Sequence, residues 1–177
     1  RLNPFKTSKT TKVTDSFAPI PVPWCKEGFY LNARPNFTFD PLFHAGAYYV
    51  QEASSMFLSH VLRCLVRNPV ALLDLCAAPG GKTTCARTSV PEESIVFSNE
   101  PINKRAQILA ENVQKFGHSD VVVTNNYPGD YKKTKLAFDV IVADVPCSGE
   151  GMFRKDPQAI AEWSEQNVAN CWQLQRT

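Results

Sequence analysis

One stretch constrains the fold of this chain more than any other. Leu72–Thr83 reads L-L-D-L-C-A-A-P-G-G-K-T, an apolar run that ends in an acid and then enters a Pro-Gly-Gly turn. A strand that stops at such a turn leaves free backbone N–H groups at its carboxyl edge. Open α/β sheets bind their ligands at that edge. The stretch therefore predicts a strand–turn–helix unit with a ligand site at the turn.

A second stretch of similar design follows further along the chain. Phe138–Val142 is apolar, and Asp144–Gly151 continues it as D-V-P-C-S-G-E-G. Proline makes this turn rigid, and the turn carries a cysteine. Two strand-end loops of this kind can face each other across one cleft. One loop can then hold a cofactor, while the other presents Asp144 and Cys147 to a substrate.

Predicted strands and helices alternate around these two stretches. Helical spacing of apolar residues runs from Ala53 to Arg67, where Ser54 or Ser55 is a candidate cap, and from Ile102 to Phe116 before Gly117. A short helix is expected at 81–87, and Asp156–Pro157 opens a last helix that runs to about Gln175. Four strands are expected, at Val70–Leu75, Ser94–Ser98, Val121–Val123 and Ala137–Ala143. This alternation predicts a parallel, Rossmann-like α/β sheet, incomplete after its fourth strand.

Composition excludes some classes of protein. Hydrophobic residues make up 44% and charged residues 20%, which is typical of a globular protein and not of a disordered one. A net charge of +2 does not by itself indicate a nucleic-acid-binding protein. Basic residues do gather locally, where they can contact phosphates or simply form a solvated surface. These groups are Arg1, Lys6, Lys9 and Lys12, then Lys132, Lys133 and Lys135, and finally Arg154–Lys155.

The six cysteines form no C-x-x-C pair and do not cluster with histidine. This argues against a structural zinc site, and no metal is expected. Reduced cysteines suit a cytoplasmic protein. No apolar run has the length of a membrane span, so no membrane partner is expected. The first residue is Arg, and we expect the chain to be a piece of a longer protein.

The two stretches resemble motifs of the RNA cytosine-5 methyltransferases of the Nol1/Nop2/Sun family. F-D-V-I-V-A-D-V-P-C-S-G (138–149) resembles the family signature, and A-A-P-G-G-K (77–82) is similar to its cofactor loop. Tyr48–Met56, Y-Y-V-Q-E-A-S-S-M, resembles the lead-in of the bacterial ribosomal-RNA branch. The resemblance implies S-adenosylmethionine as the cofactor and RNA as the partner, with ribosomal RNA first and transfer RNA second. Oligomeric state stays open.

The resemblance also implies a cofactor site. It assigns the methionine part of the cofactor to the loop made of Cys76, Ala77, Ala78, Pro79, Gly80, Gly81 and Lys82. The loop is not G-x-G-x-x-G, so a dinucleotide is not the expected ligand. Asp74 can orient the loop, and Glu100 can accept the ribose hydroxyls or cap the helix after Pro101. Lys82 can instead face water.

The adenine contact is left unassigned by the sequence. Related methyltransferases often place an Asp after the third strand, where this chain has Tyr127 in the run T-N-N-Y-P. Asn126 could substitute through its side-chain oxygen, or a backbone carbonyl could serve.

Methylation of cytosine carbon 5 needs a thiolate that adds to carbon 6, and Cys147 is the evident candidate from the residues alone. The resemblance implies a different assignment: the attacking cysteine comes from a later motif, beyond Thr177, and Cys147 helps to release the product. Asp144 then binds the cytosine edge and also lies near the cofactor, with Lys82 close to the same base. Cys171 is expected in the core. On this interpretation the chain by itself is inactive.

Two further hypotheses remain. The chain can be a non-catalytic module that binds cofactor or RNA, or a methyltransferase with a small-molecule or protein acceptor, although such acceptors need no thiol. For an RNA enzyme the target base must leave its stack. Arg154–Lys155 can then hold flanking phosphates, or they can pair with Asp156 or Glu150.

The N-terminal 45 residues or so are rich in proline and aromatic residues, which excludes long helices. Their rings can pack against the main domain or stack on RNA bases. The rings are Phe17, Trp24, Phe29, Tyr30, Phe37, Phe39 and Phe43. We therefore divide the chain into an N-terminal segment, residues 1–52, and a partial methyltransferase domain, residues 53–177.

Overall fold

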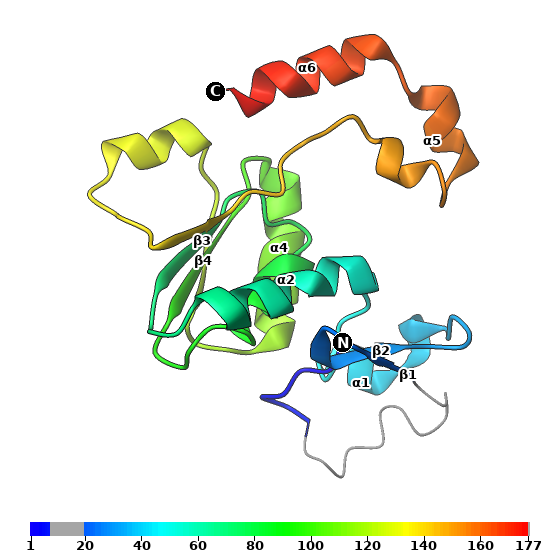
Figure 1. Ribbon diagram of the computed structural model, residues 1–177, viewed down its shortest axis with the longest axis vertical. Helices are drawn as coiled ribbons and strands as arrows, with labels where there is room; N and C mark the ends of the chain where they lie inside the picture. The colour runs from blue at the N-terminus through cyan, green and yellow to red at the C-terminus, as the bar shows by residue number, and fades with distance from the viewer. Residues whose placement is uncertain (8–19, 177) are drawn as a thin grey trace.

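The computed structural model describes residues 1–7 and 20–176, so Lys9, Lys12 and Phe17 lie outside the described residues. Figure 1 shows a parallel sheet with helices on one side, a small N-terminal unit below it and a C-terminal segment above it. The sheet has the order β5-β4-β3-β6 within the described residues.

The central sheet is built from β3 (Ala71–Asp74), β4 (Ile95–Asn99), β5 (Val121–Thr124) and β6 (Val140–Val142). Each adjacent pair is parallel, with Leu72 opposite both Val96 and Val140. The predicted parallel α/β sheet is confirmed. Strands β3 and β6 are shorter at both ends than the sequence predicts, although Leu75, just beyond β3, still donates a backbone hydrogen bond to the Val142 carbonyl at 2.9 Å.

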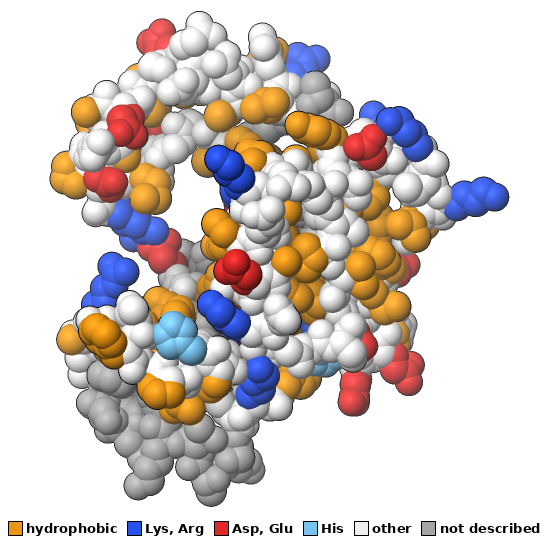
Figure 2. All heavy atoms as spheres, turned by 180° about the vertical axis from the view of Figure 1, so that it is seen from behind, with side chains coloured by type: hydrophobic (Ala, Val, Ile, Leu, Met, Phe, Trp, Pro, Cys, Tyr) orange, Lys and Arg blue, Asp and Glu red, His pale blue; other side chains and the backbone are white. Residues whose placement is uncertain are grey.

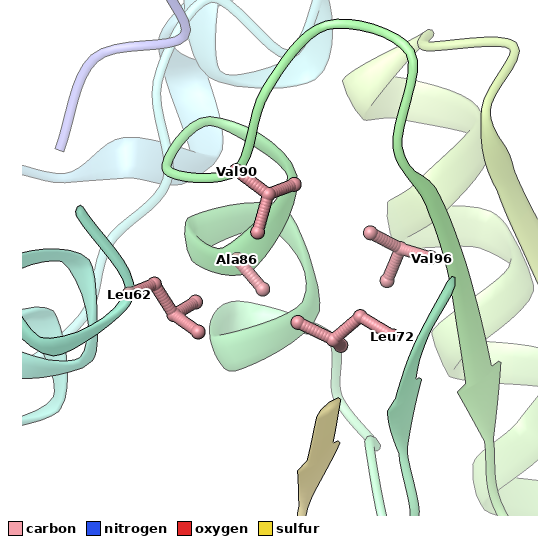
Figure 3. Close-up of a cluster of buried hydrophobic side chains, with 5 residues drawn as sticks. All are labelled: Leu62, Leu72, Ala86, Val90 and Val96. Carbon is pink, nitrogen blue, oxygen red and sulfur yellow. The ribbon is translucent and has the colours of Figure 1, made fainter. Parts of the chain in front are cut away.

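Helices α2 (Ala53–Leu65), α3 (Gly81–Arg87) and α4 (Asn103–Phe116) cover one face of this sheet. Side chains alternate between the two faces of a strand, so residues in register share a face. Figure 3 shows how Leu72 and Val96 of the strands meet side chains from α2 and α3. The cluster contains Leu62, Leu72, Ala86, Val90 and Val96. A second cluster packs α4 against the same face.

The opposite face of the sheet carries the alternate residues of each strand. Val122 is 42% exposed and Ile141 is 59% exposed. A 3-10 helix, η3 (Pro128–Lys133), lies in the connection between β5 and β6 and was not predicted. From this connection Phe138 packs edge-on against Phe97, with 5.3 Å between ring centroids. This face is therefore only partly covered.

The ends of the helices test the capping predictions. Neither Ser54 nor Ser55 caps α2, because the N-cap residue is Glu52 and its side chain makes no capping bond. Helix α2 also stops at Leu65, short of the predicted end. Gly117 ends α4 in the left-handed conformation at φ 74°, which confirms that prediction.

The predicted single helix after Asp156 is wrong. Two helices are present, α5 (Pro157–Glu162) and α6 (Glu165–Gln175), because Ser164 is extended and its side chain accepts a hydrogen bond from the Asn167 amide. Asp156 does cap α5 as predicted. Helix α6 has no buried residue, so the expectation that Cys171 lies in the core is also wrong. Figure 2 shows this C-terminal segment as an arch with an open gap beneath it.

The N-terminal segment forms an antiparallel pair, β1 (Ile20–Val22) and β2 (Cys25–Tyr30), followed by η2 (Phe37–Phe39) and α1 (Pro41–His44). It has no long helix within its described residues, as predicted. Some of its rings pack inward: Trp24 meets Phe57 of α2. Others stay exposed, and Phe39 is 82% exposed. Both predicted uses of the rings therefore stay open.

All six cysteines are free thiols. Within the part of the chain that the structure describes, no helix is long and apolar enough to cross a membrane. No group of three or more His, Cys, Asp or Glu side chains with metal-binding geometry lies among the described residues.

Candidate cofactor and substrate cleft

A cleft of about 210 Å³ opens at the carboxyl ends of β3 and β6. This is the edge at which parallel α/β sheets bind ligands. Its walls come from three segments: the lead-in to α2 with the first turn of that helix, the loop after β3 with the start of α3, and the start of the loop after β6. The lining residues are Tyr49, Val50, Gln51, Ser55, Cys76, Ala77, Ala78, Pro79, Gly81, Lys82 and Asp144.

An ion pair joins the two predicted loops across this cleft. Lys82 Nζ, in the first turn of α3, donates a hydrogen bond to Asp144 Oδ2 beyond the end of β6. The Lys82 side chain is 32% exposed and that of Asp144 is 58% exposed, so both groups remain accessible to a ligand. The alternative in which Lys82 only faces water is wrong. The two loops meet as the sequence analysis expects.

Backbone conformation fixes the loop after β3. Gly80 has φ 107°, a backbone conformation that residues other than glycine rarely adopt. A Cβ at this position would lie 3.2 Å from Leu109 Cδ1. A Cβ on Gly81 would lie 3.1 Å from the Tyr49 ring. The loop is also tied to α4, because Asn112 Nδ2 donates to the Pro79 carbonyl at 2.8 Å. The cleft wall here is therefore rigid.

Asp74 lies beneath this loop and is 1% exposed. Its Oδ2 accepts a hydrogen bond from Thr83 Oγ1 at 2.7 Å, which supports the predicted role in orienting the loop. Its Oδ1 has no hydrogen-bond partner among the described residues. Burial raises the pKa of this carboxyl group to about 6. Asp74 is thus a buried acid with spare acceptor capacity close to the cleft.

Glu100 directly follows β4 and is 1% exposed. One carboxylate oxygen accepts from the Ala78 amide at 3.3 Å, and the other accepts from the Ile102 amide at 3.2 Å. Arg105 lies 3.6 Å from the first oxygen. The hydrogen bond from the Ile102 amide agrees with the alternative in which Glu100 caps the following helix. The hydrogen bond from the Ala78 amide ties Glu100 to the predicted cofactor loop. Glu100 does not line the cavity, and its contact with a ribose stays a prediction.

The residues near the expected adenine site show no replacement for the missing Asp. Tyr127 is 70% exposed. Asn126 uses its backbone carbonyl to accept a bond from Asn99 Nδ2 at 2.9 Å. The adenine contact therefore remains unassigned.

The cysteines of the two motif loops differ in accessibility, and only Cys76 lines the cleft. Cys147 is exposed, and its loop is tied to α6 where Gln175 Nε2 donates to the Pro146 carbonyl at 2.5 Å. Cys76 is partly buried, and burial is the main cause that raises the pKa of its thiol. A raised thiol pKa disfavours the thiolate, so Cys76 is a poor nucleophile. Cys147 is the accessible thiol beside Asp144 in sequence.

The basic pair after the cysteine loop has a partner that the sequence analysis missed. Arg154 Nη2 lies 2.8 Å from Glu52 Oε1, and Lys155 Nζ lies 2.7 Å from Glu52 Oε2. The Lys155 contact is the main cause of the lowered pKa of Glu52. Pairing with Asp156 or Glu150, as the alternative had it, is not what the structure shows. Glu52 holds the segment that follows Cys147 against the lead-in to α2.

The lead-in contributes lining residues that the sequence analysis did not assign: Tyr49, Val50, Gln51 and Ser55. Arg1 orients Gln51 through a 2.8 Å hydrogen bond from Nε to Oε1. The resemblance of this stretch to a family lead-in was the signal that could have identified them. No spacing rule within one sequence pairs residue 51 with residue 144.

Comparison with known proteins decides the family. A family described as 16S rRNA methyltransferase RsmB/F matches residues 64–177, and the N-terminal domain of 16S rRNA methyltransferase RsmF matches residues 1–53. The chain belongs to the RsmB/F family. Ribosomal RNA small subunit methyltransferase F of Pectobacterium atrosepticum is 37% identical over 164 residues, covering 88% of this chain and 33% of that protein. The Escherichia coli protein of the same name is 38% identical over 154 residues, covering 83% and 32%.

Solved structures agree with this assignment. A methyltransferase homolog protein from Pyrococcus horikoshii superposes with a TM-score of 0.73 at 29% identity, covering 91% of this chain and 54% of that one. NSun6 from the same organism gives a TM-score of 0.70 at 23% identity, covering 81% and 36%, which shows the shared fold. The RsmB/F chain spans about a third of the length of the curated relatives it matches.

Proposed function

We propose that the protein methylates carbon 5 of a cytosine in ribosomal RNA, with S-adenosylmethionine as the methyl donor. The observation that carries the proposal is the Lys82–Asp144 pair, which joins the A-A-P-G-G-K loop to the D-V-P-C loop at one cleft. The names of the relatives support ribosomal RNA as the substrate, and they give no support to transfer RNA. A cytoplasmic location belongs to the proposal and suits six free cysteines.

The cleft has the chemistry that such a cofactor requires. The methionine part of S-adenosylmethionine carries a carboxylate and an ammonium group. Lys82 supplies a cation, Asp144 supplies an anion, and Asp74 has a carboxylate oxygen without a hydrogen-bond partner among the described residues. We assign the cofactor to the loop from Cys76 to Lys82, with Glu100 as the ribose acceptor. When bound, the cofactor supplies an electrophilic methyl group.

The residues of the second loop act on the base. Asp144 accepts a hydrogen bond from the amino group of cytosine and holds the ring beside Lys82. A thiolate adds to carbon 6, carbon 5 takes the methyl group, a base removes the proton from carbon 5, and the thiolate leaves. We assign the attack to a cysteine outside this chain and the release step to Cys147, whose thiol is exposed. The division into residues 1–52 and 53–177 is part of the same proposal.

Calorimetric titration of the chain with S-adenosylmethionine tests the cofactor assignment. Lys82→Met removes the cation of the cleft and is expected to weaken binding about tenfold, which corresponds to about 1.4 kcal/mol. Lys104→Met, which removes an exposed lysine from α4, is the matched control and should bind as the parent does. Equal loss in both variants, or no binding by the parent chain, would contradict the assignment.

A further inference from the structure

A second, larger cavity lies beside the cleft, in a region to which the proposed reaction assigns no role. Its volume is about 750 Å³, within the range of about 300–1,000 Å³ that is usual for ligand sites. It lies between β2, η2 and the lead-in to α2. Six aromatic side chains line it, and we call it the aromatic cavity: Phe29, Tyr30, Phe37, Phe39, Tyr48 and Tyr49.

The aromatic cavity continues into the Lys82–Asp144 cleft. Tyr49, Val50 and Gln51 line both spaces. Gln51 stands at this junction with its Oε1 held by Arg1, while its Nε2 has no hydrogen-bond partner among the described residues. A ligand that reaches from one space to the other would therefore pass the Gln51 side chain, whose buried amide nitrogen has no partner among the described residues.

Several rings of the aromatic cavity are open to solvent. Phe39 is 82% exposed and Tyr30 is 40% exposed, and Val50 beside them is 44% exposed. Phe39 makes no contact with another ring of the described residues, whereas Phe37 and Tyr48 pack against each other with 6.1 Å between centroids. The cavity thus combines a packed aromatic wall with a free ring, which suits stacking on a flat, partly polar ligand.

The charges around the aromatic cavity favour an anionic ligand. Its two carboxylates already have partners: Asp40 accepts a hydrogen bond from Tyr48, and Glu52 pairs with Arg154 and Lys155. Arg34 has no ion pair among the described residues. Arg1 is 7% exposed, and its guanidinium is bound by neutral acceptors such as Thr84 Oγ1 at 2.6 Å. The uncompensated charge of the lining is positive.

We propose that the aromatic cavity binds an unstacked base of the RNA substrate, next to the base that enters the cleft. The proposal rests on the proposed function, which supplies the RNA. Single-stranded nucleic acid is bound by exposed rings that stack on bases and by cations that contact the backbone. Phe39 supplies the free ring and Arg34 the phosphate contact. The distance between the two bases is then set by the shared wall at Tyr49, Val50 and Gln51.

Fluorescence anisotropy of the chain with a labelled single-stranded oligoribonucleotide tests this. Phe39→Ala is expected to weaken RNA binding about five- to hundredfold. Arg34→Ala is expected to weaken it a few-fold and to lower the salt dependence of RNA binding by the equivalent of about one phosphate contact. Trp172→Ala, which removes another exposed ring (56% exposed) far along the chain, is the matched control. Circular dichroism verifies that each variant is folded.

The possible outcomes distinguish failure of the aromatic cavity as an RNA site from failure of the proposed methyltransferase function. Weaker RNA binding in Phe39→Ala with unchanged S-adenosylmethionine affinity supports the cavity, as does a photocrosslink from 5-iodouridine in the oligonucleotide to its rings. Unchanged RNA binding in both variants, with the cofactor still bound, overturns the cavity as an RNA site and leaves the methyltransferase proposal standing. In that case a protein partner is the occupant to seek. Absence of both RNA and cofactor binding overturns both.

Discussion

The two loops of the cleft belong to halves of the molecule that are packed differently. The A-A-P-G-G-K loop rests on buried residues such as Leu72, Asp74 and Leu109, each at most 1% exposed. The D-V-P-C loop lies in a half in which no described residue after Phe116 is buried. The hydrophobic core fixes the first loop, whereas the second is held by exposed polar contacts, mainly to Lys82, Glu52 and Gln175. One edge of a sheet can thus combine a rigid wall with a weakly held one.

The largest contrast is expected in the strands. Leu72→Ala in β3 should lower the free energy of unfolding by about 2–5 kcal/mol, because it leaves a cavity among fully packed side chains. Ile141→Ala in β6 is the control, since its side chain is 59% exposed, and it should change stability by no more than about 0.5 kcal/mol. Urea denaturation measures both. Similar losses would show that the two halves are equally packed.

Asp74 makes the first half sensitive to pH. Its pKa is raised to about 6 by burial, so the folded state favours the protonated form. Its contribution to stability is then fully present below pH 4 and is lost as the pH rises through about 6. Asp74→Asn should abolish this loss, which amounts to about 3 kcal/mol at roughly 1.4 kcal/mol per pKa unit. Parallel curves of unfolding free energy against pH for the parent and the variant would contradict a raised pKa of Asp74.

Two glycines compare the loops directly. Gly80 and Gly149 both have left-handed backbone, at φ 107° and 81°. Gly149→Ala adds only the conformational strain of about 1–2 kcal/mol, because a Cβ there meets nothing within 4 Å. Gly80→Ala adds the contact with Leu109 and should lower stability by about 2–3 kcal/mol. Thermal unfolding of the pair tests this, and a larger effect at Gly149 would reverse the comparison.

The smallest effect on stability is expected at Glu52. Glu52→Gln should lower the free energy of unfolding by less than about 1 kcal/mol, since its ion pairs are near the surface. It should nevertheless release the segment after Cys147, because Arg154 and Lys155 both lose their partner. Hydrogen exchange over residues 145–156 should become faster. Lys133→Gln, which breaks an exposed pair with Asp130 in η3, is the control and should leave that segment unchanged.

The sequence by itself determined the sheet and its ligand edge. Apolar runs that end in an acid and a turn predicted β3 and β6, and the alternation of strands with amphipathic helices predicted parallel pairing. These patterns can be read within a short stretch of sequence. Apolar residues repeat with a period of 2 in a strand and 3.6 in a helix when one side of the element faces the core. The A-A-P-G-G-K and D-V-P-C motifs were equally visible, and their meeting followed from parallel topology.

Only the tertiary structure decided how the cleft is completed. The ion pair between Glu52 and Arg154 joins residues that are 102 positions apart, and no sequence periodicity relates them. The aromatic cavity likewise forms only when β2 and η2 fold over the lead-in, whereas the sequence also allowed the N-terminal rings to pack against the main domain. The break at Ser164 was missed because the helical pattern of the sequence continues through it, whereas in the structure the Ser164 side chain accepts a hydrogen bond from the Asn167 amide and begins a new helix. Long-range side-chain pairing and burial are properties of the assembled fold, and local sequence constrains them only weakly.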